Sequence, residues 1–397
     1  MPGDRDDFAT RLLAHFDAHR RDLPWRVPGA RTRRDPYAVL VSEAMLQQTR
    51  VRTVQRHFPE WLARFPDLAT LARAERDDVL RAWEGLGYYR RAHALHRAAG
   101  ALEEHHDGEV PADPDVLRAL PGIGPYTAAA IAAFAFDRRV VAVDANVRRL
   151  ACRLSGHRDA PNDGALAEEL LARGPAARHG DYAEALVELG ATVCTARSPS
   201  CQRCPVRSCC RAHATGPEGF PRSRQKRRPP TRERYAWVIR RADGVLLERR
   251  RGGMLEGLWG FPQHECPPTP TGAFDRDGAH ARDAVHVAAP GDRQACQRLP
   301  EIRHAYTHFR LVLTPCLTDE RMIAPTESPR EMPGEHAPER RFAPWHQLPA
   351  LAMSVLDRKV VAALVRHGHA PAWAIAVGGA EAAASRHRAA PPERGGA

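Results

Sequence analysis

The chain has 397 residues, a length typical of two or three domains that each bury their own core. Its 59 lysines and arginines exceed its 48 aspartates and glutamates, and the net charge of +11 favours a polyanionic partner through phosphate contacts and counterion release. The N-terminal sequence MPGDRDDF is acidic and polar, and no run approaches the ~18 apolar residues of a membrane span, which excludes a membrane protein and predicts a cytoplasmic one. We also expect a monomer.

Helices are expected throughout the N-terminal part of the chain. Residues 8–21 have the spacing of a short amphipathic helix, which Leu23-Pro24-Trp25-Arg26 ends. Asp35 and Pro36 are typical of an N-cap and a first-turn proline, and they predict a helix that continues to about Val54.

Glu43 lies on this second predicted helix, three residues after Leu40 and three before Leu46. A carboxyl flanked by these apolar side chains would have its pKa raised by desolvation, so it could keep a proton to donate. The same spacing also fits an ordinary helix glutamate at the edge of the apolar stripe.

A glycine-rich loop interrupts the helices predicted between residues 68 and 102. It reads Glu84-Gly85-Leu86-Gly87-Tyr88-Tyr89-Arg90-Arg91. Such a loop could insert apolar and aromatic groups into a nucleic acid while its arginines hold phosphates. A corner between two helices, with the tyrosines in the core, is the alternative.

Residues 120–127, with the sequence LPGIGPYT, form a turn between two predicted helices. Gly122 and Gly124 can adopt positive φ without Cβ strain, and Pro125 suits the first turn of the next helix. The unpaired backbone N–H groups that start this helix at Tyr126 and Thr127 would bind an anion such as a DNA phosphate. An ordinary pair of antiparallel helices fits the same spacing.

A short apolar run from Val140 to Val143 ends in Asp144. Asp144 is expected to N-cap a helix, where the helix dipole and the amide donors keep a carboxylate ionised. Glu43 and Asp144 therefore differ in expected protonation. In glycosidic-bond chemistry one acid protonates the leaving group and a carboxylate stabilises the oxocarbenium ion, at a separation of about 5 to 9 Å across one cavity.

Five of the nine cysteines lie between Cys194 and Cys210. Disulfides are uncommon in the cytoplasm, so this group predicts a metal site. Its ligands would be Cys194, Cys201, Cys204 and one of Cys209 or Cys210. The spacing does not choose between a tetrahedral zinc and an iron–sulfur cluster.

The remaining sequence differs in composition. Residues 220–234 carry seven basic side chains, one acid and three prolines, and predict an exposed linker. Residues 264–298 and 369–397 are rich in Ala, Pro, Gly, Arg and His, and we expect a mobile insertion and a disordered tail.

An α+β pattern follows the linker. Residues 235–239 and 244–249 predict a β-hairpin, residues 311–313 predict another strand, and residues 357–366 predict a closing helix.

Four motifs occur together: VSEAMLQQT at residues 41–49, LPGIGPYT at 120–127, VDANV at 143–147, and the spacing C-x6-C-x2-C-x5-C from Cys194 to Cys210. Together they resemble the MutY adenine DNA glycosylases, which belong to the helix-hairpin-helix DNA glycosylases related to endonuclease III. The resemblance runs from about residue 8 to 366. It implies a 4Fe-4S cluster and selects Cys210 as the fourth ligand.

The fold that this resemblance implies is mainly α. Residues 1–219 would form the helix-hairpin-helix glycosylase region, with a six-helix barrel at about 36–144 and an iron–sulfur cluster domain from about 1–35 and 145–219. Residues 220–234 would link it to a C-terminal α+β, Nudix-like lesion-recognition domain at 235–368.

The resemblance also implies catalytic roles. Glu43 would protonate N7 of a flipped adenine, Asp144 would stabilise the sugar cation, and Asn146 would orient Asp144. Lyase relatives carry a catalytic lysine where this chain has Tyr126. Because residues 1–225 contain no lysine, the match predicts a monofunctional glycosylase.

Further residues match the family's base pocket and DNA contacts. The pocket would be lined by Trp25, Arg26, Leu46 and Glu188. Residues that fill or wedge the duplex would be Gln48, Leu86 and Tyr88, and the hairpin would contribute Gly122, Gly124 and Thr127.

The C-terminal part resembles the Nudix-type domain with which this family senses 8-oxoguanine. Its lesion-contacting loop, usually Phe-Ser-His, reads Tyr306-Thr307-His308 here, which retains an aromatic ring, a hydroxyl and an imidazole. The glutamate-rich signature of Nudix hydrolases is absent from the sequence, so a second hydrolase activity is not expected.

We therefore expect an enzyme that removes adenine from double-stranded DNA at mismatched or oxidised pairs, opposite 8-oxoguanine and guanine. Two alternatives remain open: a pyrimidine glycosylase with lyase activity like endonuclease III, and a non-catalytic iron–sulfur DNA-binding protein.

Overall fold

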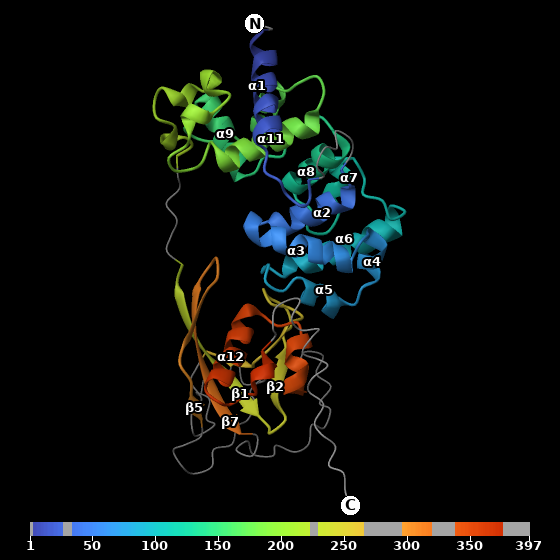
Figure 1. Ribbon diagram of the computed structural model, residues 1–397, viewed down its shortest axis with the longest axis vertical. Helices are drawn as coiled ribbons and strands as arrows, with labels where there is room; N and C mark the ends of the chain where they lie inside the picture. The colour runs from blue at the N-terminus through green and yellow to red at the C-terminus, as the bar shows by residue number, and fades with distance from the viewer. Residues whose placement is uncertain (1–2, 27–33, 223–228, 266–295, 320–337, 376–397) are drawn as a thin grey trace, which may run out of the picture. The chain divides into compact units, whose positions relative to one another are not determined.

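The computed structural model describes residues 3–26, 34–222, 229–265, 296–319 and 338–375. The backbone divides into two compact units, Met1–Lys226 and Arg227–Ala397. The first unit is helical and the second is built on a β-sheet (Figure 1). Each unit has an apolar core of its own. Within the described ranges no helix is long and apolar enough to cross a bilayer.

The first unit is a succession of helices joined by short turns. Four single-turn 3-10 helices (Cys201–Arg203, Arg207–Cys209, Arg211–His213 and Pro217–Gly219) follow α11, and Cys201 and Cys209 lie in the first two of them. The α-helices are α1 Gly3–His19, α2 Pro36–Leu46, α3 Val51–Arg64, α4 Leu68–Arg73, α5 Arg76–Ala82, α6 Arg90–His105, α7 Pro114–Arg118, α8 Pro125–Phe136, α9 Ala145–Ser155, α10 Asp163–Leu171 and α11 His179–Thr192.

Acidic and amide side chains begin many of these helices. Asp35 accepts a hydrogen bond from the Tyr37 N–H, with Pro36 in the first turn, as the sequence predicts. Asp67, Asp113, Asp144 and Asn162 cap α4, α7, α9 and α10 in the same way.

The predicted end of the second helix was wrong. We expected it to reach about Val54, but α2 ends at Leu46 and α3 starts at Val51. Gln48 has a φ of 59°, and a left-handed residue interrupts the helical ladder of hydrogen bonds. The break leaves Gln48 exposed in a turn.

One core cluster joins the two ends of the first unit. Apolar side chains of α1, α9, α10 and α11 bury one another, among them Phe8, Leu150 and Leu186, and Val206 of the cysteine-rich segment packs with them. Figure 1 shows the same helices gathered together, apart from the region of α2 to α7. The cysteine-rich segment is therefore anchored to the helix that Asp144 caps.

The second unit holds a mixed sheet of eight strands within the described residues, with the central order β3-β2-β1-β7-β5. The predicted hairpin is present, since β1 and β2 are antiparallel with Arg240 opposite Val245. The helix α12 (Val355–Arg366) packs its apolar side chains against the sheet, as predicted. The strands are β1 Thr231–Arg240, β2 Gly244–Arg249, β3 Trp259–Gly260, β4 Gln263–His264, β5 Gln297–Arg298, β6 Ile302–Ala305, β7 Arg310–Asp319 and β8 Arg340–Pro344.

The predicted linker was too long. Residues 231–234 are not an exposed connection, because they begin β1 and pair in parallel with residues 310–313 of β7. Main-chain hydrogen bonds hold this part of β1 even though its side chains are polar or charged and mostly exposed. Residues 223–228 lie outside the described residues.

The predicted mobile insertion and tail were also too wide at their edges. The insertion expected at 264–298 contains His264 at the end of β4 and the whole of β5, while its middle, 266–295, lies outside the described residues. The tail expected from residue 369 includes a 3-10 turn at Ala372–Ala374, and residues 376–397 lie outside the described part.

Candidate active site and cysteine pocket

Glu43 is almost completely buried on α2, with 6% of its surface exposed. Burial raises the pKa of its carboxyl to about 8, and the charges of Glu184 and Asp144 add to the rise. A hydrogen bond with Tyr126 and the charge of Arg26 oppose it. The desolvation inferred from the sequence is therefore the main effect, and Glu43 keeps its proton at neutral pH.

The raised pKa of Glu43 predicts a pH dependence of stability. Between its ordinary pKa of 4.5 and about 8 the folded chain binds one proton more than the unfolded chain. The free energy of unfolding should therefore fall as pH rises, by up to about 1.4 kcal/mol per pH unit from this group. The contribution is fully present below pH 4.5 and is lost as pH passes about 8.

Denaturant unfolding of the full chain from pH 5 to pH 9 measures this effect. Glu43→Gln lacks the titrating group, so it should become more stable relative to the wild type with each pH unit. Parallel pH curves for the two proteins would contradict the raised pKa.

Asp144 is the N-cap of α9, as predicted. Its Oδ1 accepts hydrogen bonds from the N–H groups of Asn146 at 2.8 Å and Val147 at 2.7 Å, and its Oδ2 accepts one from Asn146 Nδ2 at 2.7 Å. Three donors stabilise negative charge on this carboxylate and fix its orientation. The separation predicted between the Glu43 and Asp144 carboxyls stays a prediction, although the two charges influence each other.

Tyr126 completes this group from the first turn of α8. Burial raises the pKa of its hydroxyl well above the usual value, and the charges of Glu43 and Asp144 raise it further. The hydroxyl therefore stays protonated, as a hydrogen-bonding group and not a base. Three helices, α2, α8 and α9, bring these side chains together.

Two of the predicted pocket residues contact each other through ion pairs. Arg26 Nε donates to Glu184 Oε1 at 2.7 Å, and Arg26 Nη2 donates to Glu188 Oε2 at 2.9 Å. Arg21 Nε donates to Glu188 Oε1 at 2.7 Å, and Arg34 also pairs with Glu184. Arg26, Glu184 and Glu188 are all buried, so the network sits inside the protein next to the Glu43 site.

Glu184 was missed by the sequence analysis. It lies four residues before Glu188 on α11, so both carboxylates occupy one face of a helix whose other residues are largely apolar. Two acids at this spacing, on a helix with so many buried residues, were the available signal.

The other predicted pocket residues differ in exposure. Trp25 is buried and packs edge-on against Phe58, with the ring centroids 5.6 Å apart. Leu46 is partly exposed at the last position of α2. Leu46 is thus accessible at the end of the helix that carries Glu43.

The residues predicted to enter the duplex are not all exposed. Gln48 and Tyr88 are exposed, and both have positive φ, at 59° and 50°. Leu86 is only 5% exposed, so its side chain is buried in this conformation and its contact with the duplex stays a prediction. Arg91, expected to hold a phosphate, instead points inward and donates to main-chain carbonyls.

The hairpin uses its two glycines differently. Gly122 has a φ of 75°, and a Cβ there would lie 2.4 Å from the Cβ of Ala94 on α6. Gly124 does not need positive φ, since it is the extended N-cap residue of α8 with a φ of −87°. Thr127 is buried and its hydroxyl accepts a hydrogen bond from Gln47 Nε2 at 3.2 Å. The hairpin is therefore packed directly against α2 and α6.

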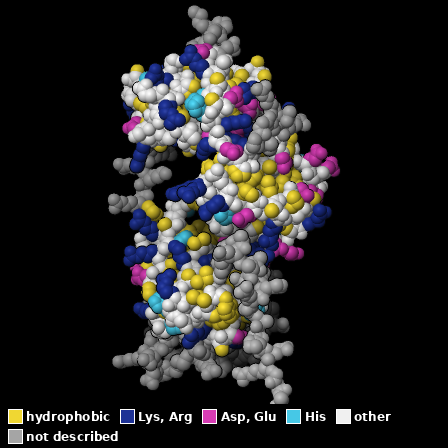
Figure 2. All heavy atoms as spheres, viewed as in Figure 1, with side chains coloured by type: hydrophobic (Ala, Val, Ile, Leu, Met, Phe, Trp, Pro, Cys, Tyr) yellow, Lys and Arg dark blue, Asp and Glu magenta, His cyan; other side chains and the backbone are white. Residues whose placement is uncertain are grey.

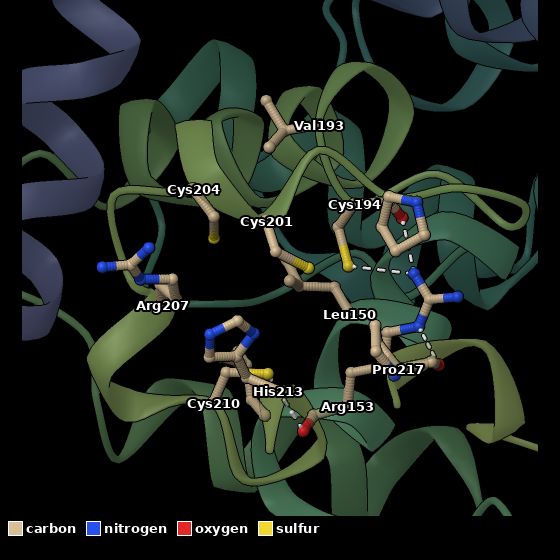
Figure 3. Close-up of a pocket in the computed structure, with 12 residues that line it drawn as sticks. Leu150, Arg153, Val193, Cys194, Cys201, Cys204, Arg207, Cys210, His213 and Pro217 are labelled. Carbon is tan, nitrogen blue, oxygen red and sulfur yellow. Dashed lines mark hydrogen bonds between the residues drawn. The ribbon is translucent and has the colours of Figure 1, made fainter. Parts of the chain in front are cut away.

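The cysteines surround one small pocket, shown in Figure 3. Cys194, Cys201, Cys204 and Cys210 line it, whereas Cys209 does not. Burial raises the pKa of the Cys204 thiol to about 11, and the neighbouring thiols of the set add to the rise. Among the described residues, no three His, Cys, Asp or Glu side chains are arranged to hold a single metal ion.

Two arginines of α9 hold the cysteine segment. Arg153, 1% exposed, donates to the carbonyls of Thr195 at 2.7 Å and Pro217 at 2.8 Å and to the sulfur of Cys194 at 3.3 Å. Arg149 donates to the Cys194 carbonyl at 2.9 Å and to Asn146 Oδ1 at 3.1 Å. Hydrogen bonds therefore run from the pocket to the residue that orients Asp144.

In the second unit, the predicted lesion-contacting residues form the turn between β6 and β7. Thr307 and His308 are exposed. Tyr306 is partly buried and packs against Phe309, with the ring centroids 4.8 Å apart and the ring planes tilted by 34°. Two of the three side chains are thus accessible at the tip of the turn.

The comparisons with known proteins agree with this arrangement. Residues 41–175 match the family of HhH-GPD superfamily base excision DNA repair proteins, and residues 234–363 match the NUDIX domain. The chain is 33% identical over 422 residues to an adenine DNA glycosylase of Rattus norvegicus, covering 91% of this chain and 78% of the relative. It is 44% identical over 255 residues to one of Mycobacterium tuberculosis, covering 62% of this chain and 80% of the relative.

The chain belongs to the adenine DNA glycosylases. The predicted family is confirmed, and so is the fold, a helix-hairpin-helix glycosylase followed by a Nudix-like domain. The HhH-GPD match of this adenine DNA glycosylase includes Glu43, Tyr126 and Asp144, and the NUDIX match includes the turn at residues 306–308. A solved thermostable thymine-DNA glycosylase is 27% identical, covers 54% of this chain and 98% of its own, and has a TM-score of 0.49.

Proposed function

We propose that this adenine DNA glycosylase removes adenine from pairs with 8-oxoguanine and guanine in double-stranded DNA, by hydrolysis and without strand cleavage. The proposal rests on a buried Glu43 carboxyl whose pKa is raised by burial and also by the charge of Asp144, a carboxylate that accepts hydrogen bonds from Asn146. The curated relatives that the chain matches are named adenine DNA glycosylases.

The reaction breaks the bond between C1′ of the deoxyribose and N9 of adenine. Glu43 donates its proton to N7, so adenine leaves as a neutral base. Asp144 stabilises the positive charge that develops on the sugar. Water then adds to C1′ and releases a proton, which balances the proton that Glu43 gave to N7 and restores the acid. The adenine must first leave the base stack, which costs a few kcal/mol.

The absence of lysine from residues 1–225 supports hydrolysis. Lyase chemistry requires a primary amine to attack C1′, and residues 1–225 contain no lysine. Tyr126 occupies the position of the lyase lysine, where its hydroxyl hydrogen-bonds to Glu43 and stays protonated. The product is therefore an intact strand with a site that lacks its base.

Specific residues would hold the flipped adenine and the duplex. We assign the base pocket to Trp25, Arg26, Leu46 and Glu188, with the ion pairs of Arg26 holding its wall. Exposed Gln48 and Tyr88 would fill the space that the adenine vacates. The hairpin at 120–127, with Gly122, Gly124 and Thr127, would anchor the strand through its backbone N–H groups.

The surface charge fits a duplex contact. Figure 2 shows basic side chains on the drawn face of both units, while acidic side chains gather near α4 to α7 of the first unit. Asp77 and Glu104 are among the acids carried by α5 and α6. DNA phosphates should therefore avoid that edge.

The four cysteines of the pocket fit a 4Fe-4S cluster better than a single ion. A tetrahedral zinc needs thiolate sulfurs about 3.8 Å apart, as follows from a Zn–S distance of ~2.3 Å. No three potential ligands among the described residues have an arrangement suited to one ion, although the four thiols share one pocket. We assign Cys194, Cys201, Cys204 and Cys210 as ligands. A bound cluster would supply structural support for the segment.

Replacing single cysteines tests this ligand set. Cys210→Ser is expected to lose most of the ~4 iron atoms per chain of a 4Fe-4S cluster, together with its visible absorbance. Cys209→Ser is the matched control, because Cys209 does not line the pocket, and it should keep both. Loss of iron in Cys209→Ser but not in Cys210→Ser would reverse the assignment.

The turn between β6 and β7 would contact the base opposite the adenine. Thr307 and His308 offer a hydroxyl and an imidazole at its tip, and Tyr306 offers an aromatic edge. We assign residues 1–219 to excision, with the barrel at 36–144 and the cluster region at 1–35 and 145–219. Lesion recognition is assigned to the domain predicted at 235–368, which begins with β1 at Thr231.

A panel of duplexes tests the pair preference. Adenine is placed opposite 8-oxoguanine, guanine, cytosine or thymine, and its excision is followed under single-turnover conditions. The rates opposite 8-oxoguanine and guanine should exceed the other two by about 10-fold or more. Equal rates opposite all four bases would refute the preference, and no excision from any duplex would refute the function.

A further inference from the structure

Arg91 lies at the start of α6, and its guanidinium binds the end of the helix that carries Glu43. Nη1 donates to the carbonyl of Ala44 at 2.9 Å and to the carbonyl of Met45 at 2.7 Å. Both carbonyls belong to the last turn of α2, where no helical N–H follows to pair with them. A cation at this end also interacts favourably with the helix dipole.

The second terminal nitrogen of the guanidinium, Nη2, binds the glycine-rich loop and the turn after α2. Nη2 donates to the carbonyls of Leu86 at 3.2 Å and Gly87 at 3.0 Å, and to Thr49 Oγ1 at 2.9 Å. Thr49 Oγ1 in turn donates to the Leu86 carbonyl at 3.2 Å. One side chain therefore joins α2, the turn containing Gln48 and the loop containing Tyr88.

The energetics of this arrangement are unusual. None of the five acceptors of Arg91 is a carboxylate, and burial lowers the pKa of its guanidinium to about 10. Its Nε is buried without a hydrogen-bond partner. Burying a charge without a carboxylate partner costs free energy, so stabilising the fold does not by itself explain an arginine at this position. Only the planar fork of an arginine can reach all five oxygens at once.

Arg91 also touches the exposed aromatic residue of the loop. Its guanidinium lies 5.4 Å from the ring centroid of Tyr88 and 5.2 Å from that of Trp83. Tyr88 is 42% exposed and has a φ of 50°, so it can contact a duplex. A movement of Tyr88 on contact with DNA would therefore change the position of the Arg91 guanidinium.

We propose that Arg91 is a positioning residue that couples duplex contact at Gln48 and Tyr88 to the placement of α2, and so to the placement of the Glu43 carboxyl against the flipped adenine. This inference rests on the proposed function. It assigns Arg91 no contact with the DNA or with the adenine. A displacement of about 1 Å at a reacting group can cost 10²-fold in rate.

The test compares binding, base flipping and excision on one duplex with adenine opposite 8-oxoguanine. The probe for flipping is the fluorescence of 2-aminopurine placed next to the target adenine. Arg91→Met should lower the single-turnover excision rate by about 10²-fold and reduce the fluorescence gain. Its affinity for the duplex should stay within about threefold of the wild type, because Arg91 contacts no phosphate.

Milder variants keep the inference testable if Arg91→Met does not fold. Arg91→Lys keeps the charge but not the fork, and should show an intermediate rate. Thr49→Val removes one acceptor and should lower excision about three- to tenfold at an unchanged melting temperature. Arg97→Met removes an exposed cation from the same helix and is the control, with an excision rate equal to that of the wild type.

The outcomes separate the inference from the function. If the wild type excises adenine and Arg91→Met does so within threefold of its rate, the inference is wrong and the function stands. If Arg91→Met is unfolded, Thr49→Val decides: a wild-type rate and fluorescence gain there overturn the inference. If the wild type releases no adenine, the proposed function itself fails.

Discussion

Replacing Glu43 by glutamine should lower single-turnover excision of adenine by about 10³-fold, within the range of 10² to 10⁴ that general acid catalysis contributes. Glutamine has nearly the same size but no acidic proton, so N7 of adenine would receive none. The raised pKa of Glu43 is the physical basis, since a carboxyl with an ordinary pKa would be ionised at neutral pH.

Glu60→Gln is the matched control for this change. Glu60 is an exposed glutamate of α3, and its loss should leave the excision rate within twofold of the wild type. The Glu43→Gln protein is expected to stay folded, because glutamine is neutral and nearly the same size as the protonated glutamic acid that it replaces. A folded Glu43→Gln with a near-normal rate would exclude Glu43 as the acid.

Replacing Asp144 by asparagine should cause the second large loss of excision rate. Asparagine is also a good N-cap, so α9 should keep its first turn. The negative charge that stabilises the developing sugar cation is lost, and so is the acceptor for Asn146 Nδ2. Preorganised electrostatic stabilisation contributes about 10² to 10³-fold, and we expect the rate to fall by at least the upper value.

Asp163→Asn controls for loss of an acidic charge near α9. Asp163 pairs with Arg148 at 2.6 Å on the surface, where such ion pairs contribute ~1 kcal/mol or less. The excision rate of the Asp163→Asn protein should match that of the wild type. An Asp144→Asn protein that binds the duplex and excises adenine at a rate within tenfold of the wild type would remove Asp144 from the mechanism.

Local signals were sufficient to predict the burial of Glu43 and the capping role of Asp144. Glu43 could be found because its neighbours at three-residue spacing are apolar, and Asp144 because an acid after an apolar run begins a helix. Both signals depend on residues close in the sequence. Their shared electrostatic environment depends on α8 and α11, which no local pattern identifies.

The missed features arise from contacts between distant segments. Leu86 lies in a loop rich in glycine, tyrosine and arginine, yet its side chain is buried, and Arg91 and Thr49 donate to its carbonyl. Glu184 gains its importance from Arg26 and Arg34, about 150 residues earlier in the chain. Partners at such separation are decided by tertiary packing.

The β-sheet shows the same limit. The start of β1 is basic and lacks an apolar alternation, so its composition indicated a linker. Its order comes from main-chain pairing with β7, which involves no particular side chain. Likewise, the cysteine spacing alone left Cys209 and Cys210 as alternatives. The family resemblance selects Cys210, and Cys210 is the one of the two that lines the pocket.

Release of free adenine from one duplex tests the central claim most directly. The wild-type chain is incubated with a duplex carrying adenine opposite 8-oxoguanine, free adenine is quantified, and each sample is divided and treated with or without hot alkali. We predict one adenine per duplex and strand breaks only after alkali. Strand breaks without alkali would reveal a lyase, and an intact strand with no free adenine would show that the chain does not catalyse the reaction.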